Sequence, residues 1–185
     1  MPRPQADDES LPTAIEPDMD TLFRTFHPRV YAYIRYRVAN VNEAEDLTSE
    51  IMERALTHLT SYDERKGAFS TWLFRIAHNT WVNQLRKQQR HGKVQVQMGK
   101  EIDDLKDQEL LPEDFVIQKE EIVRMLECMN RLPFRQQEVL TLRFAGQLKN
   151  KEIAQVLKMN ERTVSVTLLR ALRKLRQQLL EPKQE

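Results

Sequence analysis

The sequence predicts an all-α protein built of two small helical domains that are joined by a flexible acidic linker. Three observations lead to this prediction. Apolar residues recur every three or four positions along most of the chain, which is the spacing of an amphipathic helix that buries one side. A stretch with no sustained helical period interrupts this pattern between residues 92 and 113. The 185 residues are 40% hydrophobic, which is enough for one core of medium size or two small ones.

The N-terminal residues are predicted to form a tail and two short helices. Residues 1–17 contain four prolines and many acids, and we expect no fixed structure there. A first helix is predicted from Asp18 to Phe26. Pro28 is predicted to begin a second helix, because the missing N–H of proline costs nothing in a first turn. The apolar side of this second helix consists of Val30, Tyr33, Ile34 and Val38.

An acidic third helix and a long fourth helix are predicted to complete a four-helix first domain over residues 18–91. Asn42, with Glu45 three positions later, resembles a capping box, so we place the start of the third helix there. After a polar loop, the fourth helix is predicted from Phe69 to Arg90. The predicted core residues of the third helix are Leu47, Ile51, Ala55, Leu56 and Leu59, and those of the fourth are Phe69, Trp72, Leu73, Ile76, Ala77 and Leu85.

A linker and a basic second domain follow. Residues 92–113 read as the linker, and from Glu101 to Glu121 there are nine acids against two lysines. The last domain, residues 114–181, is predicted to begin with a helix near Asp114. Pro133 begins another helix, which we expect to end at Gly146.

The end of the chain has the pattern of a helix-turn-helix, with a turn from Lys158 to Asn160. Asn160 is a good N-cap for the second helix. One side of that helix carries the apolar residues Val164, Leu168, Ala171, Leu172, Leu175 and Leu179, and the other carries Arg162, Val166, Leu169, Arg170 and Arg173. The net charge from Arg131 to Gln178 is +8, whereas the whole chain has +1. This pattern favours binding of duplex DNA in the major groove over the alternative, an amphipathic hairpin with a solvated basic face.

Aromatic and basic residues are interleaved in a second candidate region, residues 61–93, whose net charge is +5. Rings beside cations are typical of proteins that bind single-stranded nucleic acid, because bases stack on the rings and phosphates meet the charges. The alternative is that the rings are core residues, and the helical spacing of Phe69 and Trp72 favours it for these two. For the loop at residues 61–68 and the polar side of the fourth helix, the residues alone do not decide between nucleic-acid binding and an ordinary surface. The rings concerned are Tyr62, Phe69, Trp72, Phe74 and Trp81.

The sequence shows no pattern for metal binding, catalysis or membrane insertion. The four histidines, residues 27, 58, 78 and 91, are scattered, and none has metal-ligand spacing with another or with Cys128, the single cysteine. We therefore expect no catalytic residue, no metal site and no cofactor. No apolar run is long enough to span a bilayer, and we expect a cytoplasmic protein with no membrane insertion.

The two candidate regions together resemble the extracytoplasmic-function (ECF) subfamily of the bacterial sigma-70 RNA polymerase sigma factors. The first resembling stretches are EAEDLTSEIMERAL and YDERKGAFSTWLFRIAHNTWVNQLR. The second are LPFRQQEVLTLRFAG, KEIAQVL and ERTVSVTLLRALRKL. The resemblance covers about residues 20–91 and 116–180, and both blocks occur in the order typical of the family.

The resemblance implies a role for each domain. The first would bind the clamp helices of the polymerase largest subunit and melt the minus 10 element of the promoter. The second would contact the polymerase flap and read the minus 35 element. The linker would run toward the active-site and RNA-exit path. An anti-sigma factor is also implied as a partner.

The resemblance also implies site residues. Those implied for core polymerase are Asp46, Ser49 and Glu50. Those implied for the minus 10 element are Tyr62, Arg65, Lys66, Asn79, Asn83, Arg86 and Arg90, with the loop at residues 61–68 taking a flipped base. Those implied for the minus 35 element are Arg162, Thr163, Ser165, Val166, Leu169, Arg170, Arg173 and Lys174.

Several positions depart from the family pattern. Ser49 stands where glutamine is frequent, Met52 where phenylalanine is frequent, and Asn83 where aspartate is common. Lys158 occupies a turn position usually given to glycine, which costs about 1 kcal/mol in a left-handed conformation. Residues 165–167 replace a more usual basic-serine-basic run, so the promoter sequence does not follow from family averages.

Two alternative functions make different predictions. A one-component helix-turn-helix regulator would bind an operator as a dimer without polymerase, which leaves the acidic helix and the aromatic block without a purpose. A DNA-processing enzyme would need clustered metal ligands or an activated nucleophile, and the sequence shows neither. The hypothesis we favour is a promoter-specific initiation factor with no catalysis of its own.

Overall fold

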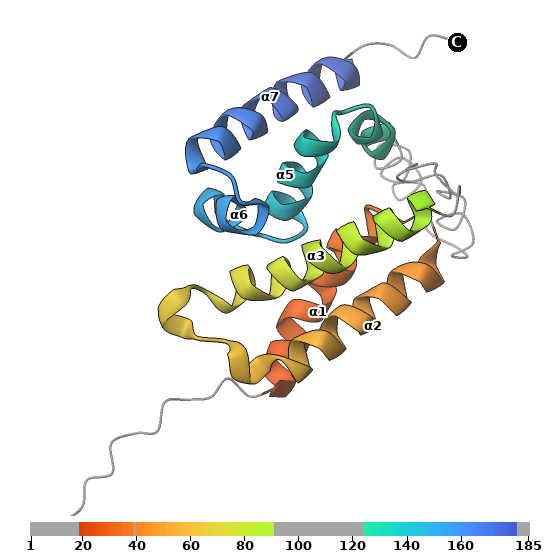
Figure 1. The fold of residues 1–185 in the computed structure, drawn as a ribbon. Coiled ribbons are helices and arrows are strands. Elements are labelled where there is room, and N and C mark those ends of the chain that lie inside the picture. The colour runs from red at the N-terminus through yellow and green to blue at the C-terminus, as the bar shows by residue number, and fades with distance from the viewer. Residues whose placement is uncertain (1–18, 39, 91–123, 181–185) are drawn as a thin grey trace, which may run out of the picture.

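The structure is a computed structural model that describes residues 19–38, 40–90 and 124–180. Within these ranges the chain is helical, and the helices form two layers (Figure 1). Helices α1 to α3 form one layer, and helices α5 to α7 form the other. The predicted tail, the predicted linker and the start of the helix predicted near Asp114 lie outside the described residues. Residues 124–130 are helical.

The first helix, α1 (Met19–Arg35), is continuous through Pro28, so the prediction of two helices separated at this point is wrong. A proline inside a helix removes one backbone hydrogen bond, at a cost of about 3 kcal/mol. The apolar side continues across the proline, however, from Phe26 to the fully buried Val30 and Tyr33. Burial of this side favours continuation of the helix over a break.

Helix α2 (Val41–Thr57) begins before the predicted cap. The N-cap is Asn40 rather than Asn42, and Asn40 Oδ1 accepts a 3.1 Å hydrogen bond from the Glu43 N–H. An N-cap side chain bonds the N2 or N3 backbone, and Asn40 has the extended backbone that this geometry needs. The buried side of α2 contains Leu47, Ile51 and Ala55 as predicted, but Leu56 is 48% exposed.

Two single turns of 3-10 helix, at Leu59–Ser61 and Glu64–Lys66, lead to α3 (Phe69–Arg90). The limits of α3 are those predicted. The first domain therefore has three α-helices and two short turns among the described residues, and not the four helices expected.

In the second layer, α5 (Phe134–Phe144) is followed by α6 (Asn150–Leu157) and α7 (Glu161–Leu180). Pro133 caps α5 as predicted, and the helix ends two residues before Gly146. Lys158 adopts the left-handed conformation, with φ 52° and ψ 47°, as expected for its position in the turn.

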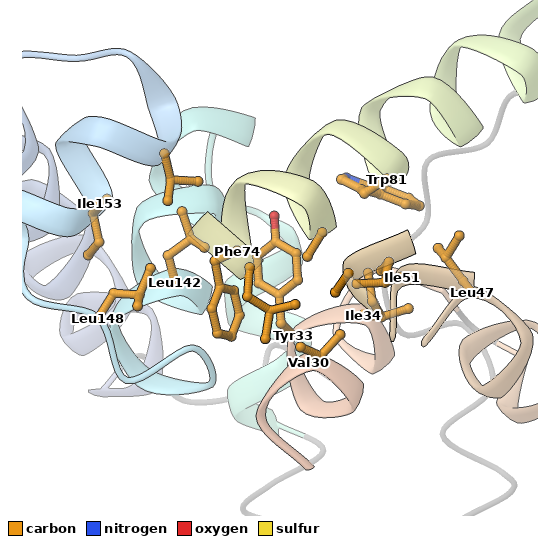
Figure 2. Packing of buried hydrophobic residues seen from close by; sticks show 14 of the residues in the cluster. Val30, Tyr33, Ile34, Leu47, Ile51, Phe74, Trp81, Leu142, Leu148 and Ile153 are labelled. Carbon is orange, nitrogen blue, oxygen red and sulfur yellow. The ribbon is translucent and has the colours of Figure 1, made fainter. Parts of the chain in front are cut away.

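The two layers share one core, which the sequence did not predict. Phe74 of α3 is fully buried and lies between Tyr33 of the first layer and Leu142 and Leu148 of the second (Figure 2). Helix α3 packs against both α2 and α6. A smaller cluster under α7 is formed by Met129, Leu132, Leu140 and Ala171.

Candidate nucleic-acid interface

The turn between α6 and α7 is fixed by backbone hydrogen bonds and by caps at both helices. Glu152 Oε2 accepts a 2.7 Å hydrogen bond from the Lys149 N–H at the start of α6. Left-handed Lys158 ends this helix, and the Met159 N–H donates to the Ala154 carbonyl at 2.8 Å. Asn160 Oδ1 then accepts from the Arg162 N–H at 2.8 Å, as the sequence predicted. The angle between the two helices is therefore set by several local contacts.

Helix α7 presents every predicted minus 35 residue to solvent. Its buried side is narrower than predicted, because only Val164 and Ala171 are fully buried and Leu172 is 39% exposed. The exposed side of α7 carries both apolar and basic side chains, which suit a DNA groove. The exposed residues are Arg162, Thr163, Ser165, Val166, Leu169, Arg170, Arg173 and Lys174.

One contact in the helix-turn-helix escaped the sequence analysis. Asn150 Nδ2, in the first turn of α6, donates a 3.0 Å hydrogen bond to Ser165 Oγ of α7. Asn150 Oδ1 is buried and makes no hydrogen bond to the described residues. No local sequence signal relates two residues fifteen positions apart in separate helices, so this pair could be found only from the fold.

A pocket of about 260 Å³ lies beside the loop at residues 61–68. Its rim includes charged residues of the loop, and its wall includes the rings of Tyr62 and Trp72. Arg75, on the first turns of α3, also lines the pocket and was not among the predicted minus 10 residues. The lining residues are Ser61, Tyr62, Asp63, Lys66, Gly67, Ala68, Thr71, Trp72 and Arg75.

Asp63 organises this loop. Its carboxylate accepts hydrogen bonds from the Arg65 N–H, at 3.1 Å, and from Arg65 Nε, at 2.9 Å, and lies 3.6 Å from Lys66 Nζ. The hydrogen bonds from Arg65 lower the pKa of Asp63. Gly67 has a φ of 153°, which side chains rarely adopt, and its carbonyl accepts a 3.3 Å hydrogen bond from Tyr62.

The five rings of this region divide between core and surface. Phe74 and Trp81 are buried core residues. Phe69 and Trp72 are half-buried and form with Tyr62 a cluster in which the ring centroids lie 5.3 to 5.6 Å apart. Phe74 and Trp81 are therefore core residues, as the alternative expected for the rings, whereas Tyr62 and Trp72 line the pocket.

A polar stripe on α3 leads away from the pocket. Asn79, Asn83, Arg86 and Arg90 are all exposed, at positions that recur every three or four residues and so share one side of the helix. Exposed Arg75 extends the stripe to the pocket itself. The arrangement joins a ring-lined pocket to a row of amides and guanidinium groups, which suits a single strand with one base displaced.

The acidic surface of α2 lies open. Asp46 and Ser49 are exposed, and Glu50 forms a 2.7 Å ion pair with Arg54 one turn later. Both partners of this pair are more than 40% exposed, and pairs of this kind contribute little to stability. The acidic groups are therefore accessible to a basic partner.

Among residues 19–38, 40–90 and 124–180 no group of three His, Cys, Asp or Glu side chains is placed to hold a metal ion. Cys128 is buried and carries a free thiol. No helix in the same ranges has the length and apolarity required to cross a membrane.

Comparison with protein families matches both candidate regions. The model of "Sigma-70 region 2" matches residues 22–91, and that of "Sigma-70, region 4" matches residues 122–175. The first match contains all but the first three residues of α1, and all of α2, the pocket and α3. The second contains α6, the turn and α7 as far as residue 175.

Individual relatives agree with the family matches. The ECF RNA polymerase sigma factor SigX of Bacillus subtilis is 28% identical over 166 residues, which is 89% of this chain and 85% of SigX. The ECF RNA polymerase sigma factor BldN of Streptomyces coelicolor is 34% identical over 154 residues, 83% of this chain and 57% of BldN.

A solved structure supports the fold. The sigma factor RpoE of Bartonella quintana, in complex with the anti-sigma factor NepR, superposes with a TM-score of 0.65 at 19% identity, over 88% of this chain and 96% of RpoE. The two family matches, the relatives and this fold agree, so the chain belongs to the ECF subfamily of the sigma-70 RNA polymerase sigma factors, which are transcription initiation factors.

Proposed function

We propose a division of labour among the three exposed surfaces of this sigma factor. The acidic surface of α2 binds core polymerase at the clamp helices of its largest subunit. The pocket and the α3 stripe capture the separated minus 10 strand, and α7 reads the minus 35 duplex while its domain contacts the polymerase flap. The observation that supports this most directly is that the ring-lined pocket, the polar stripe and the recognition helix are all exposed in one chain.

The minus 10 proposal rests on the chemistry of the pocket. A flipped base needs a concave site with a ring for stacking and polar groups for its edge. Tyr62 and Trp72 supply the rings, while Asp63 and Lys66 supply an acceptor and a donor. Asn79, Asn83, Arg86 and Arg90 then follow the strand beyond that base, with Arg65 at the loop and Arg75 at the junction.

The minus 35 proposal assigns different roles to the first and the later turns of α7. Arg162, Ser165, Val166, Leu169 and Arg170 lie on the side open to the groove. Arg173 and Lys174, further along the helix, are placed to hold phosphates. Phosphate contacts give affinity and register, whereas contacts to base edges give sequence preference.

Further proposals concern partners and chemistry. We assign an anti-sigma factor as a partner, because the similar RpoE of Bartonella quintana is found in complex with the anti-sigma factor NepR. We assign the protein to the cytoplasm, where core polymerase acts, and no catalytic step of its own. Affinity capture of the tagged full chain from its own cells, followed by mass spectrometry, tests for both core polymerase and an anti-sigma factor.

Run-off transcription tests the main proposal. Purified full chain and core polymerase are mixed with a cognate promoter fragment, and the expected result is a transcript that starts at one position. Core polymerase alone is the first control, and a fragment with a scrambled minus 10 element is the second. Absence of both polymerase binding and a specific transcript would contradict the proposal.

A further inference from the structure

The hydroxyl of Ser165 is held by two hydrogen bonds within the helix-turn-helix. Asn150 Nδ2, from α6, donates to Ser165 Oγ at 3.0 Å. Ser165 Oγ donates to the Glu161 carbonyl, one turn earlier in α7, at 3.1 Å. A hydroxyl has one hydrogen and two lone pairs. The hydrogen and one lone pair are therefore used inside the protein, although the side chain itself is exposed.

The hydroxyl of Ser165 points its hydrogen into the protein whichever way the Asn150 amide is turned. Asn150 Oδ1 is buried and has no hydrogen-bond partner among the described residues, while Nδ2 lies on the serine. If the amide were reversed, its carbonyl would lie on Ser165 and would accept the serine hydrogen in place of the Glu161 carbonyl. In both arrangements Ser165 has no hydrogen left to donate, so a ligand at its exposed side meets an acceptor.

The neighbours of Ser165 on the exposed side of α7 offer no competing hydrogen bond near it. Arg162, Ser165, Val166 and Leu169 share this side, because they are spaced three or four residues apart. Residues 163–169 contain no charged side chain. Val166 is 40% exposed and Leu169 is 49% exposed, and the side chain of neither forms hydrogen bonds. Ser165 is therefore the hydrogen-bonding group at the middle of this side.

The four bases differ in what they offer to such an acceptor. In the major groove adenine presents an N6 amino group and cytosine an N4 amino group, and both donate hydrogen bonds. Guanine presents N7 and O6, and thymine presents O4, all of which only accept. An acceptor placed against guanine or thymine would leave two acceptors without a hydrogen bond, which is costly. A serine restricted to accepting therefore discriminates between the two classes of base, whereas a freely turning hydroxyl serves either.

We propose that Asn150 and Ser165 form a specificity-determining pair that reads one exocyclic amino group, of an adenine or a cytosine, in the minus 35 duplex. Ser165 accepts the hydrogen bond from the amino group. Asn150 is a positioning residue, which keeps Ser165 Oγ in the orientation that donates to the Glu161 carbonyl. This role depends on the proposed function of α7, the reading of the minus 35 element in its major groove.

A panel of minus 35 duplexes identifies the base pair that Ser165 contacts. The full chain is bound to core polymerase, and its affinity is measured for promoter fragments in which each minus 35 pair is changed in turn to the other three. Ser165→Ala is measured on the same panel, because alanine suits this exposed helical position. We expect one position at which the wild type prefers adenine or cytosine by about two- to twelvefold, the range for one hydrogen bond, and at which Ser165→Ala has no such preference.

Base analogues then test the hydrogen bond itself. At a preferred adenine, purine removes the amino group and 7-deazaadenine removes N7. At a preferred cytosine, 2-pyrimidinone removes the amino group. Loss of the amino group should weaken binding by the wild type about two- to twelvefold more than binding by Ser165→Ala. Loss of N7 should have the same effect on both proteins, because N7 has no hydrogen for Ser165 to accept.

Two further variants separate positioning from general stability. Without Asn150 the serine can turn its hydrogen toward guanine or thymine, so Asn150→Ala should reduce the preference to less than about twofold. A merely structural role would lower the affinity for every duplex alike. Thr57→Ala is the matched control, because Thr57 Oγ1 is exposed on α2 and donates to the Glu53 carbonyl at 2.9 Å, as Ser165 does to Glu161. It should leave the base preference unchanged.

The outcomes distinguish this pair from the proposed function. A preference for guanine or thymine at the position that depends on Ser165 would overturn the pair, as would an equal effect of the amino group on the wild type and on Ser165→Ala. An unchanged base preference in Asn150→Ala would overturn its positioning role. If no minus 35 substitution altered binding by the wild type, the proposed function of α7 would fail. If such substitutions altered binding but none depended on Ser165, only the pair would fail.

Discussion

Asn150 and Ser165 connect the two helices of the helix-turn-helix through a 3.0 Å hydrogen bond. Ser165 Oγ in turn donates to the Glu161 carbonyl at 3.1 Å. A hydroxyl has one hydrogen and two lone pairs, so this serine keeps a single lone pair for DNA. Its predicted part in base reading is therefore restricted to accepting one hydrogen bond while Asn150 holds it in place.

Removing Asn150 should weaken minus 35 binding indirectly. Asn150→Ala is expected to cost about 0.5–1.5 kcal/mol of duplex affinity, the usual net value of one hydrogen bond. Fluorescence anisotropy with a matched and a mismatched duplex measures this loss. Ser165→Ala and the double variant complete a cycle, in which the double loss should be smaller than the sum of the single losses. Strict additivity would show that the two residues act independently.

Arg170 and Lys174 should affect binding in different ways. Arg170→Ala is expected to weaken the matched duplex by about 1–3 kcal/mol and to reduce discrimination at one base pair. Lys174→Ala should weaken all duplexes about equally and reduce the salt dependence by about one phosphate contact. Anisotropy titrations at several salt concentrations distinguish the two. Equal loss on matched and mismatched duplexes for Arg170→Ala would remove it from the base-reading residues.

Reversing the charge of Asp46 should reduce core polymerase binding. The side chain is exposed on α2 and far in sequence from the helix-turn-helix, so Asp46→Lys should leave binding of the minus 35 duplex unchanged. Biolayer interferometry with immobilised core polymerase measures polymerase binding, and fluorescence anisotropy measures binding of the minus 35 duplex. Glu127→Lys, also exposed but outside α2, is the matched control. Parallel loss of both activities would indicate unfolding instead.

Gly67 should be required for the shape of the minus 10 pocket. With φ at 153°, Gly67→Ala imposes backbone strain of about 1–3 kcal/mol or displaces the loop that carries Lys66. We expect slower promoter opening, followed with a fluorescent base analogue in the minus 10 element. Minus 35 binding should be unchanged, and an unaltered opening rate would show that the loop does not form the base site.

Acid should weaken the contact between the layers. Burial alone would raise the pKa of Glu138, but Arg37 and His78 more than offset this and hold the pKa below its usual value. A carboxyl of this kind stabilises the folded state above its unfolded pKa, and this stabilisation is lost as pH falls through the folded pKa. Urea unfolding at a series of pH values below about 5 should therefore show a smaller pH dependence for Glu138→Gln than for the wild type. Identical pH profiles would mean that Glu138 does not contribute.

The sequence predicted most helices because their apolar periodicity is strong, and it failed where a local signal competed with packing. Pro28 signalled a helix start, but burial of Val30 and Tyr33 on the same side as Phe26 carried one helix through it. Two asparagines were available to cap α2, and only the backbone conformation decided for Asn40.

Spacing along the chain predicted the exposed sides of single helices in the candidate sites, but it did not predict contacts between helices. Periodicity tells which residues share a side of a helix, so the exposed side of α7 and the α3 stripe followed from spacing. It does not tell which helix covers the buried side. The shared core around Phe74 and the Asn150–Ser165 pair therefore required the fold, as did the 39% exposure of Leu172, which was expected in the core.

The buried side of α7 carries only two fully enclosed residues, Val164 and Ala171, and this has a consequence for how promoter preference can diversify. Substitutions at exposed positions such as Val166, Leu169 and Arg170 touch neither the core nor the contact with α3, so their effects on stability should be small. Binding preference can then be altered one residue at a time without loss of folding. A set of factors with different target promoters could be made from this chain by changing α7 alone.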